Sequence, residues 1–328
     1  MVRMALAILL AGTVVVAQET RTTPPEDMIL AAQVMLDAAG FSPGEIDGKA
    51  GANFGRALAA YQQSRGLTTS GKLDDATLGR LKQDFKSLPP VISYTITDAD
   101  IAGPFQPDIP KDLVEQAKLQ SLDYRNSLEA IAEKFHASPA LIESLNPDQT
   151  FMQTGTSITV PNVTPLEPFP PPTETKPSSA AKPSAPANTK PSGVRIVVTK
   201  KTSALTVEDA DGRVLFFAPV TTGSQHDPLP IGKWKVTGVQ RMPVFNYNPD
   251  LFWDASPQHS KAKIPAGPNN PVGIAWIDLS KPHYGIHGTP EPSQIGHVQS
   301  HGCVRMTNWD VRRVMEWAQP GTLVVFQR

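Results

Sequence analysis

Three short stretches near the C-terminal end hold the densest group of reactive side chains: His283-Tyr284-Gly285-Ile286-His287-Gly288-Thr289, Ile295-Gly296 and Ser300-His301-Gly302-Cys303-Val304-Arg305-Met306. Cys303 is the only cysteine of the 328-residue chain, and six of the seven histidines follow residue 193. A free thiol is mostly protonated near neutral pH, so a nucleophilic cysteine needs a neighbouring base, and histidine titrates in that range. Gly302 allows close backbone approach and can present amide donors to an oxyanion. These stretches predict nucleophilic catalysis by a cysteine.

Two other interpretations of these residues are open. Cys303 could be a small core residue, as single cysteines often are. The cluster could bind zinc, but Pro282 and the glycines between His283 and His287 argue against a helical ligand pair. We therefore expect no metal and no cofactor. Other histidines and aromatic residues are expected at the surface, in the core or in a lid: His226, His259, His297, Phe252, Trp253 and Trp276.

The fixed spacing of these stretches resembles the signature of the L,D-transpeptidase catalytic domain, and the similarity covers residues 194–328. The resemblance implies that Cys303 is the nucleophile and that His287 accepts the thiol proton and later donates one to the leaving amine. It also implies that the Gly288 carbonyl orients the imidazole. Further supporting residues frame the pocket: Ser300, His301, Gly302 and Arg305. The implied fold is an all-β-type sandwich with one helix and a lid among residues 241–270.

The residue pattern of this C-terminal part is β-rich. Strands are expected at residues 195–199, 204–208, 214–220, 273–278, near 286 and at 323–326. Asp211-Gly212 between the second and third of these is a strong hairpin signal. One helix is expected at about residues 308–317, with its apolar side chains facing inward.

Residues 26–86 predict a small α-helical N-terminal module. Apolar residues recur at helical spacing around residues 28–36 and 54–61, turn residues separate these runs, and a third helix is expected from Asp74 to Lys82. The segment Gly44-Glu45-Ile46-Asp47-Gly48 and the helix that follows resemble the three-helix peptidoglycan-binding module found beside many wall enzymes. A generic helical domain is the alternative.

Residues 91–163 predict an α+β middle unit. We expect Ser127 to cap a helix, residues 139–145 to form a second helix and residues 158–160 to form a strand. This order resembles a lysin-motif (LysM) repeat, which binds glycan. Its first strand is not evident and the stretch Pro104–Gln120 departs from the pattern, so a spacer domain is an equal alternative.

The two remaining segments are expected to lie outside any core. Arg3, an apolar run over residues 4–16 and Ala17 have the layout of a secretory signal, which predicts cleavage after residue 17 and no membrane span in the mature form. Residues 164–193 hold nine of the 33 prolines. They predict a linker that transmits little mechanical coupling and lets the catalytic domain fold and move independently.

Export and the resemblance together define the expected function. A net charge of -1 gives no basic field for nucleic acid. An exported enzyme lacks nucleotide fuel, so a new peptide bond must inherit its energy from an old one through a thioester. The resemblance implies that Cys303 attacks the L-centre carbonyl of the diamino acid in a tetrapeptide stem and releases D-alanine.

The acceptor remains open at this point. An amine on another stem would crosslink peptidoglycan, and a protein amine would attach that protein to the wall. Water would make the chain a carboxypeptidase or cysteine hydrolase, and a decayed site would leave a wall-binding adaptor. The expected partners are therefore peptidoglycan stem peptides and glycan, with a protein as a further acceptor, in the periplasm or cell wall.

Overall fold

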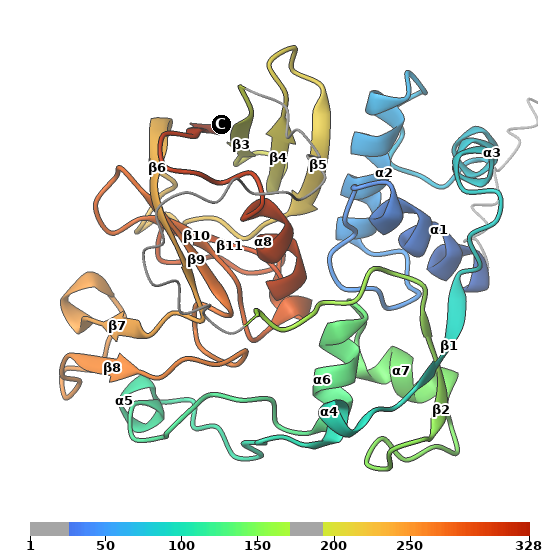
Figure 1. Cartoon of the computed structure of the whole chain (residues 1–328). Coiled ribbons are helices and arrows are strands. Elements are labelled where there is room, and N and C mark those ends of the chain that lie inside the picture. Colours follow the sequence, from blue (N-terminus) through green and yellow to red (C-terminus); the bar gives the residue numbers. More distant parts are fainter. Residues whose placement is uncertain (1–25, 171–192) are drawn as a thin grey trace, which may run out of the picture.

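The computed structural model describes residues 26–170 and 193–328, which form three units packed against one another (Figure 1). The predicted secretory signal (residues 1–17) and most of the predicted linker (residues 164–193) lie outside the described residues. The N-terminal helices lie beside the C-terminal sheet, and the middle unit runs beneath both in this view. In the described ranges, no helix combines the length and apolar character needed to cross a membrane.

The N-terminal module is a bundle of three helices: α1 (Glu26–Ala38), α2 (Ala52–Ser64) and α3 (Asp75–Asp84). α2 buries the apolar residues that repeat at helical spacing: Phe54, Ala57, Leu58 and Tyr61. α3 begins where the side chain of Asp74 accepts a hydrogen bond from the Thr77 amide. The helical character predicted for residues 26–86 is therefore present.

The middle unit is a mixed one, with two strands and four short helices: β1 (Val91–Thr95), α4 (Asp98–Ile101), α5 (Leu113–Gln116), α6 (Ser127–Lys134), α7 (Pro139–Leu145) and β2 (Ser157–Pro161). β1 and β2 pair antiparallel. β1 is the first strand of this unit, and it was not evident from the sequence. The expected cap at Ser127 is wrong by one residue, because the side chain of Asn126 accepts the capping hydrogen bond from the Glu129 amide.

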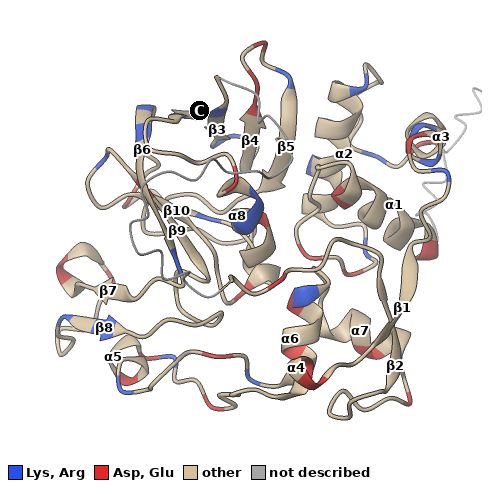
Figure 2. Cartoon of the chain, viewed as in Figure 1, with Lys and Arg blue, Asp and Glu red and all other residues tan. Residues whose placement is uncertain are grey.

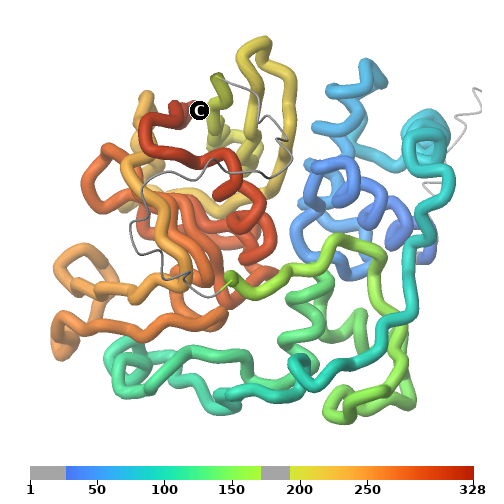
Figure 3. Tube along the Cα trace, viewed as in Figure 1, coloured from blue at the N-terminus to red at the C-terminus, as the bar shows by residue number. Residues whose placement is uncertain are grey.

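Residues 102–124, which we call the arm, leave the middle unit and reach the C-terminal domain (Figure 3). There they meet the lid, a hairpin of β7 (Phe245–Tyr247) and β8 (Ala262–Ile264) with the short 3-10 helix η1 (Pro249–Leu251) between them. Buried Leu122 of the arm packs with Tyr247 and Ile264. The Leu122 amide donates to the Ala266 carbonyl at 3.0 Å. The stretch that departed from the expected pattern is thus the support of the lid.

The C-terminal domain is built on one eight-stranded sheet in the order β11-β10-β9-β6-β12-β3-β4-β5. Its strands are β3 (Arg195–Thr199), β4 (Ala204–Glu208), β5 (Val214–Pro219), β6 (Gly232–Arg241), β9 (Ala275–Leu279), β10 (Gly285–His287), β11 (Val304–Arg305) and β12 (Leu323–Gln327). The helix α8 (Asn308–Val314) contributes buried Val311 and Val314 to the same core as residues from both ends of the sheet.

The expectation of a β-sandwich is wrong in this domain, because one continuous sheet curls into a half-barrel. The curl brings the two ends of the sheet together. The amide of Thr221, just after β5, donates to the Arg305 carbonyl on β11 at 3.0 Å, and the reciprocal bond is 2.9 Å. A sandwich and a curled sheet both bury alternate residues, so residue alternation along the chain does not distinguish them.

The N-terminal module continues the sheet beyond β5. The Phe217 amide donates to the Gly40 carbonyl at 2.8 Å, and the Ser42 amide donates to the Phe217 carbonyl at 2.9 Å. The ring of Phe41 stacks on that of Phe217 with centroids 6.5 Å apart. The expectation that the catalytic domain moves independently on a tether is therefore wrong: the module shares hydrogen bonds and a hydrophobic cluster with it.

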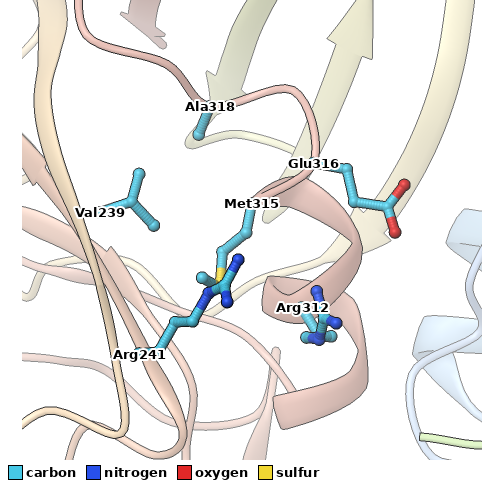
Figure 4. A pocket seen from close by; sticks show the side chains of 6 residues that line it. All are labelled: Val239, Arg241, Arg312, Met315, Glu316 and Ala318. Carbon is cyan, nitrogen blue, oxygen red and sulfur yellow. The ribbon is translucent and has the colours of Figure 1, made fainter. Parts of the chain in front are cut away.

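The start of the predicted linker also packs against the folded units. The Leu166 amide donates to the Lys134 carbonyl at 2.8 Å. The guanidinium carbons of Arg241 and Arg312 lie 5.3 and 4.6 Å from the ring centroid of Phe169. Both arginines line a pocket of about 330 Å³ (Figure 4) with Val239, Met315, Glu316 and Ala318. Residues 166 and 169 thus anchor the chain before it leaves the described range.

Candidate active site

Cys303 lies at the edge of the sheet, directly before β11. Gly302 before it has a φ of 103°, in the region that favours glycine. A Cβ at Gly302 would also meet Cε1 of Tyr284 at 2.8 Å. Glycine is therefore required at position 302 for two independent reasons, and it lets the chain turn tightly into the residue that carries the thiol.

The strand register puts the side chains of Cys303 and His287 on one face of the sheet. β10 and β11 pair in parallel, with Ile286 opposite Val304 and His287 opposite Arg305. Paired residues share a face and side chains alternate along a strand, so the alternation, continued to Cys303 directly before β11, puts its side chain on the face of His287. The thiol itself lies 3.7 Å from the His283 carbonyl oxygen. The opposite face carries the core and α8.

His287 is held as a neutral base. Its Nδ1 lies 2.7 Å from the Gly288 carbonyl oxygen. A carbonyl can only accept, so Nδ1 carries the proton and Nε2 is left with a free lone pair. Burial lowers the pKa of His287 to about 3, helped by the charge of Arg305 and opposed by the Gly288 carbonyl. The indole of Trp276 stacks on the imidazole at 5.2 Å and 14°.

The thiol is also neutral at rest. Burial raises the pKa of Cys303, while a hydrogen bond from the Gly285 backbone and the charge of Arg305 act in the opposite direction. Burial likewise lowers the pKa of the Arg305 guanidinium. The ground state therefore has a neutral thiol and a neutral imidazole, with a cation placed to favour the thiolate once it forms.

Ser300 ties down the loop that precedes the thiol. Its Oγ donates to the Cys303 carbonyl at 2.6 Å. Its own amide donates to the Thr222 carbonyl, and its carbonyl accepts from the Ser224 amide, both at 3.1 Å. Two of these bonds connect the loop to the segment after β5, and the third lies within the loop. The loop is thereby held at both of its ends.

His301 faces the lid instead of His287. Its Nε2 lies 2.7 Å from Oδ1 of Asp254. Its ring lies 4.9 Å from that of Phe252 and 6.0 Å from that of Trp253. The ring of His226 stacks on that of Trp253, with ring centroids 4.5 Å apart. The lid thus rests on a residue two positions from the thiol.

The remaining histidines have other surroundings. His283 has a φ of 66° and contributes its carbonyl to the thiol. His259 bridges the lid and the arm, with Nδ1 2.9 Å from the Tyr247 hydroxyl and Nε2 3.0 Å from Asp112. His297 lies exposed. Among the described residues, no three histidine, cysteine or acidic side chains are grouped as metal ligands would be.

Two residues near His287 escaped sequence reasoning. Trp276 was expected only to pack, yet it stacks on the imidazole. Asn308 had no role beyond starting a helix, yet its Oδ1 accepts the Thr289 amide at 3.2 Å, next to Gly288. The alternation of β9 could have placed Trp276 on the face of His287. Nothing in the sequence links Asn308 to residue 289.

Two parts of the chain match known protein families. Residues 193–326 match the YkuD family, described as the L,D-transpeptidase catalytic domain, and residues 25–81 match a peptidoglycan binding domain family. The chain is 28% identical to the L,D-transpeptidase YkuD of Bacillus subtilis over 62% of this chain and 94% of that protein. It is 31% identical to the L,D-transpeptidase YqjB of the same organism over 42% of this chain and 73% of that protein.

A solved L,D-transpeptidase from Mycobacterium smegmatis is 18% identical, with a TM-score of 0.34, over 41% of this chain and 58% of that chain. The chain thus spans less than two thirds of the length of that protein.

Proposed function

The chain belongs to the L,D-transpeptidase family with a YkuD catalytic domain, and on that premise we propose that it crosslinks peptidoglycan stems by acyl transfer through Cys303. The family is one of cysteine-dependent transferases. The observation that carries the proposal is the pairing of β10 with β11, which sets an oriented neutral imidazole and the chain's only thiol on one face.

In the first half-reaction, Nε2 of His287 takes the thiol proton as Cys303 Sγ attacks the L-centre carbonyl of the diamino acid in a tetrapeptide stem. The tetrahedral oxyanion is stabilised by backbone amides near Gly302 and by the charge of Arg305. The C–N bond to D-alanine breaks, and His287 donates its proton to the leaving amine. The products are a thioester on Cys303 and free D-alanine.

In the second half-reaction, an amine on a neighbouring stem attacks the thioester. His287 takes a proton from that amine and returns it to the departing sulfur. One peptide bond is broken and one is formed, so no nucleotide is consumed. Water in place of the amine would give a tripeptide by hydrolysis, and this is the second outcome that the experiment below distinguishes.

The other two units fit a wall-bound enzyme. The N-terminal module matches a peptidoglycan binding domain family, which supports docking of the chain on the polymer. The middle unit has a strand, helices and a strand that pairs antiparallel with the first, an order compatible with glycan binding of the LysM kind. An exported location in the periplasm or cell wall, after removal of residues 1–17, follows from this substrate.

The test is to incubate the mature protein with purified disaccharide-tetrapeptide and to identify the products by mass spectrometry. We expect crosslinked dimers and free D-alanine. Cys303→Ala should abolish both while leaving the circular dichroism spectrum unchanged, and His287→Ala should lower the rate by roughly 10²–10⁴. Tripeptide without dimer would assign hydrolysis, and parental activity in Cys303→Ala would refute the mechanism.

A further inference from the structure

An acidic residue of the middle unit reaches the back of the catalytic site. Glu133 lies in the last turn of α6, and only 8% of its surface is exposed. Its Oε1 accepts hydrogen bonds from the Tyr124 hydroxyl at 3.0 Å and from Nδ2 of Asn308 at 2.9 Å. Asn308 begins α8 of the catalytic domain, so this second bond joins two units.

Asn308 is fully buried and uses all of its hydrogen-bonding capacity. Nδ2 donates to Glu133 and to the Pro268 carbonyl, the latter at 3.2 Å. Oδ1 accepts from the amides of Ile274, at 3.1 Å, and Thr289, at 3.2 Å. Because the amide group has one donor end and one acceptor end, two acceptors on the Nδ2 side fix which end faces Thr289.

The Thr289 N–H and the Gly288 C=O belong to the same peptide group. That group is planar, so holding the N–H holds the carbonyl, which points the opposite way. The Gly288 carbonyl is the acceptor for His287 Nδ1, at 2.7 Å. A Cβ at Gly288 would meet Oδ1 of Asn308 at 2.1 Å, so the two are in close contact. The chain of contacts therefore runs from Glu133 through Asn308 and one peptide group to the imidazole.

We propose that Glu133 is a positioning residue for the acid–base His287, acting through Asn308 and the Gly288–Thr289 peptide. The middle unit is then a working part of the catalytic site as well as a spacer or wall contact. The inference rests on the proposed function for the role of His287, and it goes beyond it by assigning a residue outside the catalytic domain.

The role requires an acceptor oxygen and does not require a charge. Burial raises the pKa of Glu133 to about 8, with Asn308 and Tyr124 acting in the opposite direction and Glu129 adding to the increase. A protonated carboxyl group keeps its carbonyl oxygen as an acceptor. Glutamine keeps that oxygen in a side chain of the same length. Methionine has similar volume and no strong acceptor, so the two substitutions form a matched pair.

The test compares Glu133→Met and Glu133→Gln, with Glu143→Gln on an exposed face of the middle unit as control. The first readout is kcat and KM with disaccharide-tetrapeptide. We expect Glu133→Met to lower kcat roughly 10–100-fold, the range known for loss of the partners that orient metal-bound histidines, with KM within about twofold. Glu133→Gln should keep at least about a third of the parental kcat.

The second readout needs no substrate. Cys303 is the only thiol, so its alkylation by iodoacetamide across pH reports its proton acceptor directly. We expect Glu133→Met to shift the profile toward that of His287→Ala, and Glu133→Gln to retain the parental profile. An unchanged profile in Glu133→Met, or equal losses in both variants, overturns the proposal. If the parent fails to turn over stem peptides but the profiles shift as expected, the proposed function fails and the positioning role stands.

Discussion

Arg313 of α8 donates two hydrogen bonds to the two carboxylate oxygens of Asp37 on α1, at 2.9 and 2.7 Å. The carboxylate is almost completely buried, and His136 of the middle unit lies 3.3 Å from it. α8 also carries Arg312, and these two arginines make its last turn basic (Figure 2). One ion pair with a histidine neighbour thus joins all three units behind the catalytic sheet.

This ion pair should be a major source of stability. Asp37→Ala leaves the half-buried Arg313 charge without its hydrogen-bonded carboxylate, so we expect the free energy of unfolding at pH 7 to fall by about 3–5 kcal/mol. Urea titration followed by circular dichroism measures it. Asp27→Ala, an exposed position on the same helix, serves as the control and should change the value little. Equal urea midpoints for parent and Asp37→Ala would contradict this prediction.

The same pair predicts how stability depends on pH. Burial alone would raise the pKa of Asp37, but Arg313 and His136 outweigh it and hold that pKa well below its usual range. A depressed carboxyl pKa stabilises the folded state above the unfolded value of about 3.9, and this contribution is lost as the pH falls. Burial also lowers the pKa of His136 in the folded state. Below about pH 6.5 this histidine is protonated in the unfolded chain, which further lowers the stability of the folded state.

The contribution of Asp37 and His136 to the urea midpoint should therefore decrease from about pH 6.5 downward and more steeply below about pH 4. Asp37→Asn should weaken the lower step, because it removes the titrating carboxyl group. A parental pH dependence in Asp37→Asn would assign the acid sensitivity to other groups.

Isolating the catalytic domain should destabilise it. A fragment of residues 193–328 exposes Phe217 and Ala204, which are buried beside the N-terminal module, and leaves Arg313 without Asp37. We expect a lower thermal midpoint than that of the full chain and reduced turnover of soluble stem peptide. Differential scanning calorimetry and paired rates on one substrate measure both. Equal midpoints would mean that the interface contributes nothing.

The pH profile of catalysis should be broad. The competent form has neutral His287, and its pKa of about 3 keeps it neutral through mild acid. The raised pKa of Cys303 keeps the thiol protonated at neutral pH. We expect kcat/KM to be nearly flat from about pH 5 to pH 8, where an ordinary histidine would lose activity below about 6.5.

Arg305→Gln provides the internal check. Removing its charge should raise the pKa of His287, so the acid limb of kcat/KM should move to higher pH. A parental acid limb in this variant would mean that Arg305 does not act on the imidazole.

Support of the lid by the arm should control substrate binding. Leu122→Ala removes a fully buried side chain between Tyr247 and Ile264 and should cost about 2–5 kcal/mol at that contact. We expect KM to rise and residues 248–261 to become accessible to limited proteolysis. Met152→Ala, at an exposed position of the middle unit, is the control. An unchanged KM and digestion pattern would show that the arm does not hold the lid.

Local patterns predicted the parts of the fold that depend on neighbouring residues. The Asp211-Gly212 turn, the strands around it and the motif from residue 300 to 306 are local, and the structure has strands at the residues expected beside that turn. The L,D-transpeptidase family assignment and the cysteine-dependent enzyme class are confirmed. The catalytic roles of individual residues remain predictions.

Long-range features were not accessible in this way. β1 is only partly buried and pairs with a strand more than sixty positions later in the chain, so it lacks a clear local signal. β11 has two residues, too few for any periodicity. Glu133 lies 175 positions from Asn308, and neither residue type favours that contact. Such contacts depend on how the units pack, and no short segment of the sequence determines that packing.

The hydrogen bonds from Gly40 and Ser42 to Phe217 also have a consequence for solubility. They occupy part of the outer edge of β5, and the bonds between Thr221 and Arg305 occupy backbone groups at the other end of the sheet. An open strand edge is a template on which a second molecule can add its own strand, and sheets left in that state aggregate. The N-terminal module therefore protects this edge from pairing with another molecule. We expect the full-length protein to stay monomeric at concentrations where the fragment of residues 193–328 precipitates.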